Sequence, residues 1–194
     1  MSSIALHGKR VHLVPPTLEH AAPLEAVAGL DPDAFRYMSA SPLIDGGEHY
    51  VRDMLEAKAR GECIPYTVID VATGAPIGST RFADIDSGHP RCEIGWTWLA
   101  PSHRGGGINA EMKLLMLEHA FTALDCERVA IKTDLRNVRA QRAIEHLGAT
   151  REGVLRRHLL ATDGYIRDTV YYSVIAPEWD EVRAHLEQRL TCGR

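Results

Sequence analysis

The segment from Trp96 to Lys113 contains the residues whose order points most directly to chemistry. A strand-like stretch ends at Pro101, three consecutive glycines follow Arg104, and an amphipathic helical pattern begins after Gly107. Glycine lets the chain turn tightly and lets a ligand approach the backbone, and the first turn of a helix offers free N–H groups and the positive end of its dipole. Phosphate oxygens bind well there. The segment therefore predicts a phosphate-binding loop.

Other interpretations of the glycine triplet compete with this one. A glycine triplet in front of a helix can be a flexible connection. A P-loop for nucleotide triphosphates is excluded, because the segment lacks the Gly-Lys-Ser or Gly-Lys-Thr ending of that motif. Gly105, Gly107 and Ala110 fit the loose spacing of a dinucleotide fingerprint, but the strand before them is polar and aromatic, whereas a buried parallel strand is an apolar run.

Counted from Arg104, the loop has an arginine, two residues, a glycine, one residue and the polar Asn109. This order resembles the pyrophosphate loop of the GNAT superfamily of acyl-CoA-dependent N-acyltransferases. The resemblance covers nearly the whole chain, from about Leu6 to about Leu190. Similarity to the second GNAT motif comes from the strand-like run Arg128–Thr133, from Asn137, and from a helical pattern through Ala140, Ala143, Ile144 and Leu147 that Gly148 and Ala149 close.

The C-terminal part is similar to one subgroup, typified by the ribosomal-protein N-terminal acetyltransferases RimJ and RimL. The residues that carry this similarity are Glu152–His158, the Asp163-Gly164 turn, the strand-like run Arg167–Val174 and the Glu178-Trp179 pair.

The order of elements and the resemblance both indicate an α+β fold, with a GNAT-like mixed, mostly antiparallel central sheet flanked by helices on both faces. We expect a single domain over residues 1–194. Ile4–Val14 is expected to form a hairpin or a strand bent around Gly8. Further strands are expected at Ile64–Val71, Pro76–Ile85, Arg91–Leu99 and Arg128–Thr133, and in a final pair joined by Asp163-Gly164. Helices are expected after Thr17, Gly46, Gly107, Asn137 and Pro177.

The resemblance implies acetyl-CoA or another acyl-CoA as co-substrate. In GNAT enzymes the strand before the glycine loop separates from its neighbour and binds the pantetheine arm, while the loop binds pyrophosphate. Trp98 and Leu99 are therefore expected along the arm, and Asn137 at the pantetheine or acyl group, unless it caps a helix instead. Asn109 replaces the usual glycine or alanine and is expected to bond phosphate or cap its helix. The phosphates are assigned to Arg104, Gly105, Gly106, Gly107, Ile108 and Asn109.

Acyl transfer to an amine needs a neutral amine, a polarised carbonyl and a proton for the departing thiolate. Glu93 stands at a position that resembles the general-base glutamate of some GNAT enzymes. The alternative interpretation is a solvent-facing or salt-bridged strand residue. Other candidates for the base near the preceding turn are Asp84, Asp86 and His89.

The general acid is left open by two departures from the family. Ile144 stands where many GNAT enzymes have a tyrosine, and Ala140 replaces a serine of the RimL-like group. The proton then comes from water or from another tyrosine, such as Tyr171 or Tyr172, or needs no dedicated residue because a thiolate is a fair leaving group. Both tyrosines also fit ordinary strand positions.

The acceptor pocket has two groups of candidates. The first group is apolar and also fits core packing: Phe35, Tyr37, Met38, Trp96 and Trp98. The second group is Arg156, Arg157 and His158, which suit an acidic acceptor or a carboxylate on a longer acyl group, although a solvated strand face explains them equally well.

Composition excludes several classes of function. The 194 residues carry a net charge of -4, which argues against a nucleic-acid partner, and no apolar stretch approaches the ~20 residues that span a bilayer. No signal peptide is evident, and Cys63, Cys92, Cys126 and Cys192 lack C-x-x-C spacing, so free thiols in the cytoplasm are expected. His89 with Cys92 is the one close His/Cys pair, and no metal site is expected.

These observations favour an enzyme that transfers acetyl from acetyl-CoA to a primary amine of a small molecule or a protein N-terminus. A CoA-binding sensor without turnover and an acyltransferase that uses a dicarboxylic donor such as succinyl-CoA are the alternatives. The size of the chain and the RimJ/RimL-like resemblance also indicate a homodimer.

Overall fold

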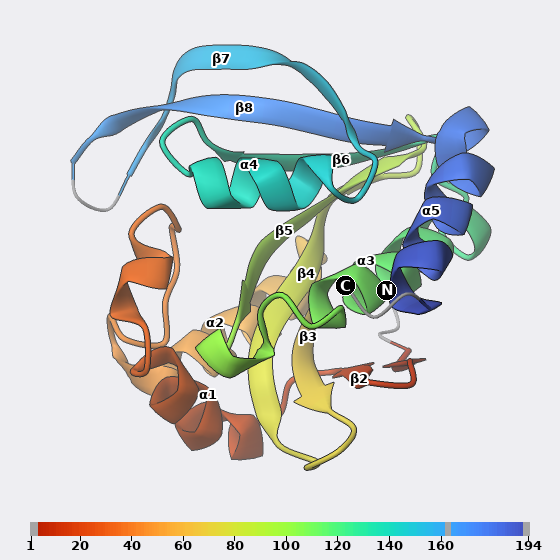
Figure 1. Cartoon of the computed structure of the whole chain (residues 1–194). Coiled ribbons are helices and arrows are strands. Elements are labelled where there is room, and N and C mark those ends of the chain that lie inside the picture. Colours follow the sequence, from red (N-terminus) through yellow and green to blue (C-terminus); the bar gives the residue numbers. More distant parts are fainter. Residues whose placement is uncertain (1–3, 162–163, 192–194) are drawn as a thin grey trace.

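The computed structural model describes residues 4–161 and 164–191, and in these residues eight strands form one sheet in the order β1-β2-β3-β4-β5-β6-β8-β7 (Figure 1). The strands are β1 (Leu6–His7), β2 (Val11–Val14), β3 (Cys63–Asp70), β4 (Pro76–Asp86), β5 (Arg91–Leu99), β6 (Arg128–Asp134), β7 (Thr150–Leu160) and β8 (Ile166–Ile175). The β5–β6 pair is parallel and the other neighbours are antiparallel. The predicted mixed, mostly antiparallel sheet is confirmed.

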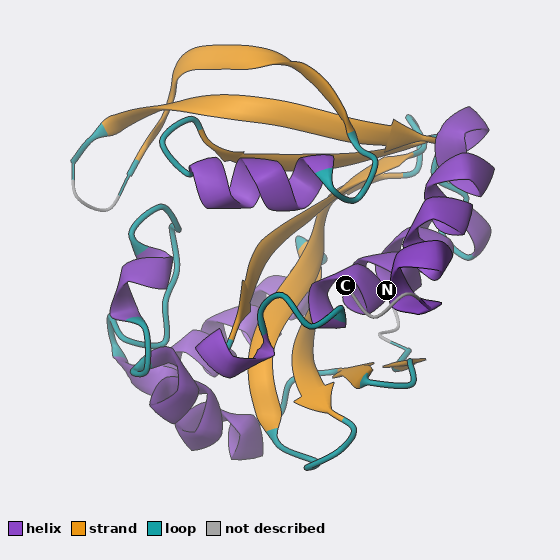
Figure 2. Cartoon of the chain, in the orientation of Figure 1, coloured by secondary structure: helices purple, strands orange, loops and turns teal. Residues whose placement is uncertain are grey.

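Helices cover both faces of this sheet (Figure 2). The α-helices are α1 (Ala21–Ala28), α2 (Gly46–Ala59), α3 (Ile108–Thr122), α4 (Val138–Glu145) and α5 (Trp179–Thr191); the short 3-10 turns are Leu18–His20, Pro32–Phe35, Pro101–His103 and Ala176–Glu178. Two neighbours on β4 show the two faces, since successive strand residues point to opposite sides. Ser79 hydrogen-bonds to Tyr50 of α2, whereas Thr80 bonds to Met116 of α3.

Two apolar clusters correspond to these faces. The larger one joins the sheet to α3, α4 and α5 and includes Phe82, Met112, Leu147 and Leu186. The smaller one joins α1 and α2 to Trp98 of β5. The site therefore lies on a sheet that is packed from both sides, which restrains the strands that carry its residues.

The separation of β5 from β6 positions the site. Their parallel register runs from Arg91 with Arg128 to Glu93 with Ala130, and the pairing of these two described strands ends there. Both strands continue beyond that point, β5 to Leu99 and β6 to Asp134. Figure 1 shows β5 turning away from β6. The backbone N–H and C=O groups on the facing edges are thereby left for a ligand.

Two predicted helices begin later than the sequence pattern indicates. After Thr17 the chain first makes a 3-10 turn, and α1 begins at Ala21, which puts Pro23 in its first turn, where proline is tolerated. After Pro177 the 3-10 turn also comes first, and α5 begins at Trp179. Asp163 of the predicted turn and Cys192 lie outside the described residues, and the other three cysteines are buried free thiols.

Candidate active site

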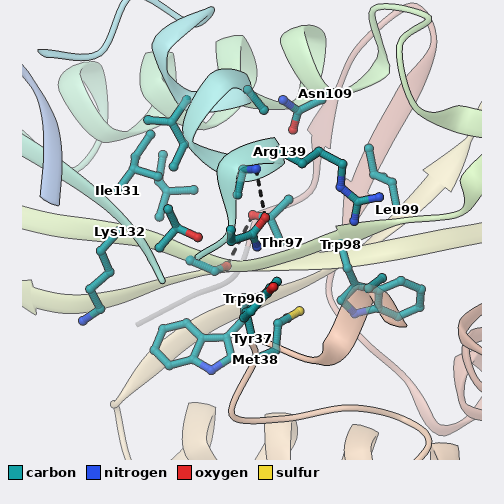
Figure 3. A pocket seen from close by; sticks show the side chains of 18 of the residues that line it. Tyr37, Met38, Trp96, Thr97, Trp98, Leu99, Asn109, Ile131, Lys132 and Arg139 are labelled. Carbon is teal, nitrogen blue, oxygen red and sulfur yellow. Dashed lines mark hydrogen bonds between the residues drawn. The ribbon is translucent and has the colours of Figure 1, made fainter. Parts of the chain in front are cut away.

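A cavity of about 770 Å³ opens where β5 and β6 separate. Its walls come from both strands, the start of α3, one side of α4, the segment 34–39 and the end of β7. Figure 3 shows side chains from these elements around the opening, with Asn109 and Arg139 on one side and Trp96, Tyr37 and Met38 on the other. The cavity thus joins segments that lie far apart in the sequence.

A bulge in β5 shapes one wall of the cavity. The register with β4 shifts, because Ser79 pairs with Trp98 while Arg81 pairs with Gly95, and Trp96 has a φ of +49°. Such bulges bend a strand and change the direction of its side chains, and a non-glycine residue in this region stores strain. The Trp96 indole donates to Ser39 Oγ at 3.1 Å and lies against the Arg81 guanidinium.

The predicted phosphate loop lies at one end of the cavity. Gly105 and Gly107 have φ of +82° and +87°, a conformation that favours glycine, and Gly107 is the N-cap of α3. No described atom lies within 4 Å of a Cβ built on Gly105 or Gly106. The loop therefore has the positive-φ glycines, the adjacent helix start and the open space that a pyrophosphate needs.

Arg104 is held by the protein rather than directed freely into this space. Its Nε donates to the Leu99 carbonyl at 2.9 Å, and its Nη1 forms an ion pair with Asp31. The Arg104 guanidinium holds the pKa of Asp31 below its usual range. Arg139 Nη1 lies 4.0 Å from the same Asp31 carboxylate, and both arginines line the cavity.

The two asparagines have different places. Asn137 is the N-cap of α4, where its Oδ1 accepts from the Ala140 N–H at 3.0 Å, and it also lines the cavity. Asn109 lines the cavity as the second residue of α3. It does not cap the helix, because Gly107 occupies that position.

The aromatic candidates divide into core and cavity residues. The Trp98 indole donates to the Tyr50 hydroxyl at 3.1 Å and packs edge-on against Phe35, so both rings belong to the smaller apolar cluster. Trp98 and Leu99 border the cavity on the open edge of β5. Tyr37, Met38 and Trp96 line the opposite part of the cavity.

Glu93 is buried at the closed end of the separated strands, where its Oε2 lies 2.6 Å from Lys132 Nζ. Burial raises the pKa of Glu93, while the hydrogen bond from Lys132 works in the opposite direction. The other base candidates are not in the cavity lining: the Asp84 side chain is exposed, and Asp86 accepts from the backbone N–H groups of Gly88 and His89. Glu93 thus combines burial with access to the cavity.

None of the positions considered for the general acid offers a clear proton donor to the cavity. Ile144 and Ala140 line the cavity with carbon alone. The Tyr172 hydroxyl donates to Glu145 at 3.0 Å and its ring is in the core. Tyr171 lies beside Lys132, whose Nζ is 5.8 Å from its ring centre.

The sequence pattern missed five lysine and arginine residues of the cavity, and Lys113 and Arg167 are two of them. Lys113 Nζ donates to Thr97 Oγ1 at 2.8 Å, and burial lowers the pKa of Lys113 to about 7. Lys113 is one of eight buried residues of α3, and a lysine in a helical pattern gives no local signal of burial. Arg167 lines the cavity, whereas Arg156 and Arg157 are exposed outside it. Arg167 gave no signal because its place in the cavity depends on the distant segment that contains Tyr37.

Residues 4–161 and 164–191 contain neither a cluster of metal ligands nor a helix that could span a membrane. No group of three or more histidine, cysteine, aspartate or glutamate side chains there is arranged to hold a metal ion. None of the helices in that part of the chain is long and apolar enough to cross a membrane.

Comparison with known proteins supports the resemblance seen in the sequence. A domain model described as the acetyltransferase (GNAT) domain matches residues 10–150. The uncharacterized N-acetyltransferase p20 of Bacillus licheniformis is 28% identical over 153 residues, which make up 77% of this chain and 84% of p20. The solved structure of a putative acetyltransferase from T. thermophilus is 37% identical, with 96% of each chain covered and a TM-score of 0.83.

A second similar structure is that of Mycobacterium smegmatis RimJ in complex with CoA-disulfide. It is 23% identical, covers 99% of this chain and 96% of its own, and has a TM-score of 0.81, which shows a shared fold. The domain model covers most of the chain, and the T. thermophilus structure is similar over nearly all of it. This chain therefore belongs to the GNAT family and is an N-acetyltransferase.

Proposed function

We propose that this protein transfers acetyl from acetyl-CoA to a primary amine of a small molecule or of a protein N-terminus. The observation that carries the proposal is the cavity between β5 and β6, which has the glycine loop near one end and the buried Glu93 at the other. Six residues of strand separate Glu93 from Leu99, a length of about 20 Å at ~3.3 Å per residue. That length suits an extended arm with its thioester near Glu93.

In this proposal the CoA moiety follows β5. Pyrophosphate lies at Arg104, Gly105, Gly106, Gly107, Ile108 and Asn109, where backbone N–H groups and the dipole of α3 attract it. The pantetheine arm bonds to the free backbone edge of Trp98 and Leu99, and Asn137 contacts it from α4. Asn137 Oδ1 is engaged by its own helix, so its amide N–H₂ is the group available for such a contact.

Glu93 takes a proton from the acceptor ammonium, directly or through water, and leaves a neutral amine. The amine nitrogen forms a bond to the thioester carbonyl carbon, backbone N–H groups on the open edge of β5 stabilise the oxyanion, and the carbon–sulfur bond then breaks. The Lys132 ammonium keeps Glu93 within reach of the cavity and favours its ionised form. The attacking nitrogen then loses its second proton to water, the departing thiolate takes a proton from water in exchange, and Glu93 returns its own proton to solvent.

The test is release of CoA thiol from acetyl-CoA with a panel of primary amines, for the wild type and for Glu93→Gln. The variant is expected to lose roughly a hundredfold in turnover, because general-base catalysis contributes about that factor, and to keep most of its CoA affinity. Glu48→Gln is the matched control, because Glu48 is an exposed carboxylate on α2 that does not line the cavity. Wild-type turnover at saturating substrates in Glu93→Gln would remove Glu93 from the mechanism.

A second function is favoured by Ile144 and Ala140, which put carbon where relatives have a tyrosine and a serine. These residues support a protein that binds acetyl-CoA as a sensor without turnover. CoA binding by calorimetry, without thiol release for any amine in the panel, would favour the sensor over the enzyme.

We also propose that residues 1–194 form a single GNAT domain and that the protein acts in the cytoplasm as a homodimer. The sheet described above supports the first part, because its strands extend from Leu6 to Ile175 without a second sheet in the described residues. The three buried free thiols support a reducing environment.

A further inference from the structure

Arg167 is a cavity residue that the proposed transfer mechanism does not use. It lies on β8 just after the hairpin, and its side chain lines the same cavity as Glu93. Its Nε donates to Thr169 Oγ1 at 3.0 Å, and its Nη1 donates to the Tyr37 carbonyl at 3.2 Å. These two bonds, from β8 and from the segment 34–39, fix the plane of the guanidinium.

No described carboxylate lies within 4.0 Å of the Arg167 guanidinium. A guanidinium has five N–H donors, and described residues engage two of them. Burial lowers the pKa of Arg167, while the more distant charges of Asp134 and Glu93 act in the opposite direction. An anion in the cavity would supply the missing partner.

The balance of charge in the cavity points the same way. Among the described lining residues, five arginine and lysine side chains keep their charge at neutral pH and one, Glu93, is a carboxylate; the five are Arg104, Lys132, Arg139, Arg167 and Arg189. Asp31 lies against Arg104 and Arg139, while Glu93 pairs with Lys132. Arg189 lies on α5 and donates a hydrogen bond to the His146 carbonyl. The next residue, Leu190, lies near Gly107 of the glycine loop.

Arg167 is close enough to Glu93 for their charges to interact, and it shares the cavity with Tyr37, Met38 and Trp96. One substrate could therefore place its ammonium at Glu93 and an anionic group at Arg167. Apolar walls around an arginine strengthen such a pair by lowering the local dielectric constant. Planar carboxylates match the guanidinium with two parallel hydrogen bonds.

We propose that Arg167 binds a carboxylate of the acceptor, so that the preferred acceptors are primary amines with a carboxylate a few bonds from the amino group. This inference rests on the acetyl transfer proposed above and adds the class of acceptor. Free amino acids and peptides with an acidic N-terminal residue share this chemistry.

The experiment compares acceptors in which one carboxylate is replaced by an amide, with rates referred to the concentration of unprotonated amine. L-Methionine is paired with L-methioninamide, and the peptide amide Glu-Ala-Ala with Gln-Ala-Ala, at saturating acetyl-CoA. The wild type is expected to favour the carboxylate member of one pair by about tenfold to a hundredfold in kcat/KM, as a charge-assisted bond predicts. The pair that shows the preference identifies a free amino acid or a peptide as the source of the carboxylate.

Arg167→Gln is expected to abolish this preference by raising KM for the carboxylate acceptor, with little change for the amide and in kcat. Arg167→Lys keeps the charge and is expected to restore part of the preference. Arg156→Gln is the matched control, because Arg156 is an exposed arginine outside the cavity. Thermal unfolding of each variant shows whether it is folded; if Arg167→Gln is unfolded, the comparison uses Arg167→Lys.

Three results would overturn the inference: equal use of acid and amide by the wild type, equal losses on both in Arg167→Gln, or a preference for succinyl-CoA over acetyl-CoA that this variant abolishes. The last result would assign Arg167 to the acyl donor. Calorimetry of the same acceptors with the CoA-loaded protein gives the preference independently of turnover. Absence of thiol release with intact, Arg167-dependent binding would contradict the transfer reaction and leave the carboxylate site standing.

Discussion

Glu93 and Lys132 form a buried pair whose state of ionisation decides how the proposed reaction depends on pH. Their oxygen and nitrogen lie 2.6 Å apart, with 5% of the Glu93 and 17% of the Lys132 side chain exposed. Burial disfavours the Glu93 carboxylate, and the Lys132 ammonium favours it. Because burial has the larger influence, Glu93 is a stronger base than an exposed glutamate.

The pH dependence of the rate follows from this balance. A base acts in its deprotonated form, so activity rises with pH through the pKa of Glu93, and the raised pKa places this acidic limb above that of an ordinary glutamate. Lys132→Met removes the influence that lowers this pKa and is expected to move the limb to higher pH still. Profiles of kcat/KM against pH check this, with Lys58→Met on α2 as the control. A limb that stays in place in Lys132→Met would contradict the role of Glu93.

Lys113 gives a second prediction at this scale, which concerns stability. Its pKa is about 7 in the folded protein and about 10.5 when exposed, because burial disfavours the ammonium. As pH falls from 10 to 7, the unfolded chain binds a proton that the folded protein does not, so the folded state loses stability over that range. Lys113→Met removes this loss.

The gain in unfolding free energy from Lys113→Met is therefore expected to be larger at pH 6 than at pH 9.5, as measured by urea unfolding at each pH. Lys9→Met serves as the control, because Lys9 is an exposed lysine between the two outer strands β1 and β2. A gain that does not change with pH would show that Lys113 is protonated in the folded protein.

The glycine loop is the element on which the proposed CoA binding depends. Gly106 and Gly107 are adjacent, but Gly107 alone of the two has a φ in the left-handed region. A Cβ on Gly107 would also collide with Arg10 Nη1, which donates to the Gly106 carbonyl at 2.9 Å and holds the loop. The strain of a side chain at Gly107 therefore comes from both the backbone and this contact.

Gly107→Ala is expected to weaken CoA binding by about tenfold, since a left-handed residue costs ~1–2 kcal/mol and that energy corresponds to such a factor. Gly106→Ala adds the same methyl group where no described atom lies within 4 Å, and is expected to have a smaller effect. Calorimetric titration with CoA measures both. Equal affinities of Gly107→Ala and the wild type would contradict the assignment of the phosphates to this loop.

The whole molecule presents a long outer strand, β7, whose 11 residues form one border of the sheet. The β7–β8 hairpin also exposes apolar side chains, among them Leu155, Leu159 and Leu160. Exposed strand edges and apolar patches of this kind are usually covered by another chain. This surface agrees with the proposed homodimer, since two-fold dimers are the commonest closed assemblies.

Light scattering at micromolar concentration tests the assembly. A dimer gives about twice the chain mass of 21.5 kDa, and a value near 21.5 kDa would contradict the proposal. Leu155→Lys is expected to shift the protein toward the monomer. Leu18→Lys is the matched control, because Leu18 has a similar exposure, 45% against 47%, at the opposite end of the sheet order.

The helices, the strands and the glycine loop before α3 could be predicted from the sequence, because they depend on neighbouring residues. Glycines at 105–107 before an amphipathic pattern specify a tight turn and a helix start, and the structure has α3 begin at Ile108. The three central strands also follow their predicted ranges closely, since alternating side chains and turn residues are local signals. Glu93 was singled out by motif order, which depends on chain position alone.

Tertiary structure alone decided which side chains share the cavity. Arg167 meets the Tyr37 carbonyl across 130 positions of sequence, and Lys132 meets Glu93 because β5 and β6 become neighbours through a crossover by α3. Such pairs leave no local pattern in the sequence, since Arg167, Lys132 and Glu93 each resemble an ordinary charged residue of a strand. The end of the β5–β6 pairing at Glu93 is also a property of the assembled sheet, and the cavity and its excess of positive charge follow from that separation.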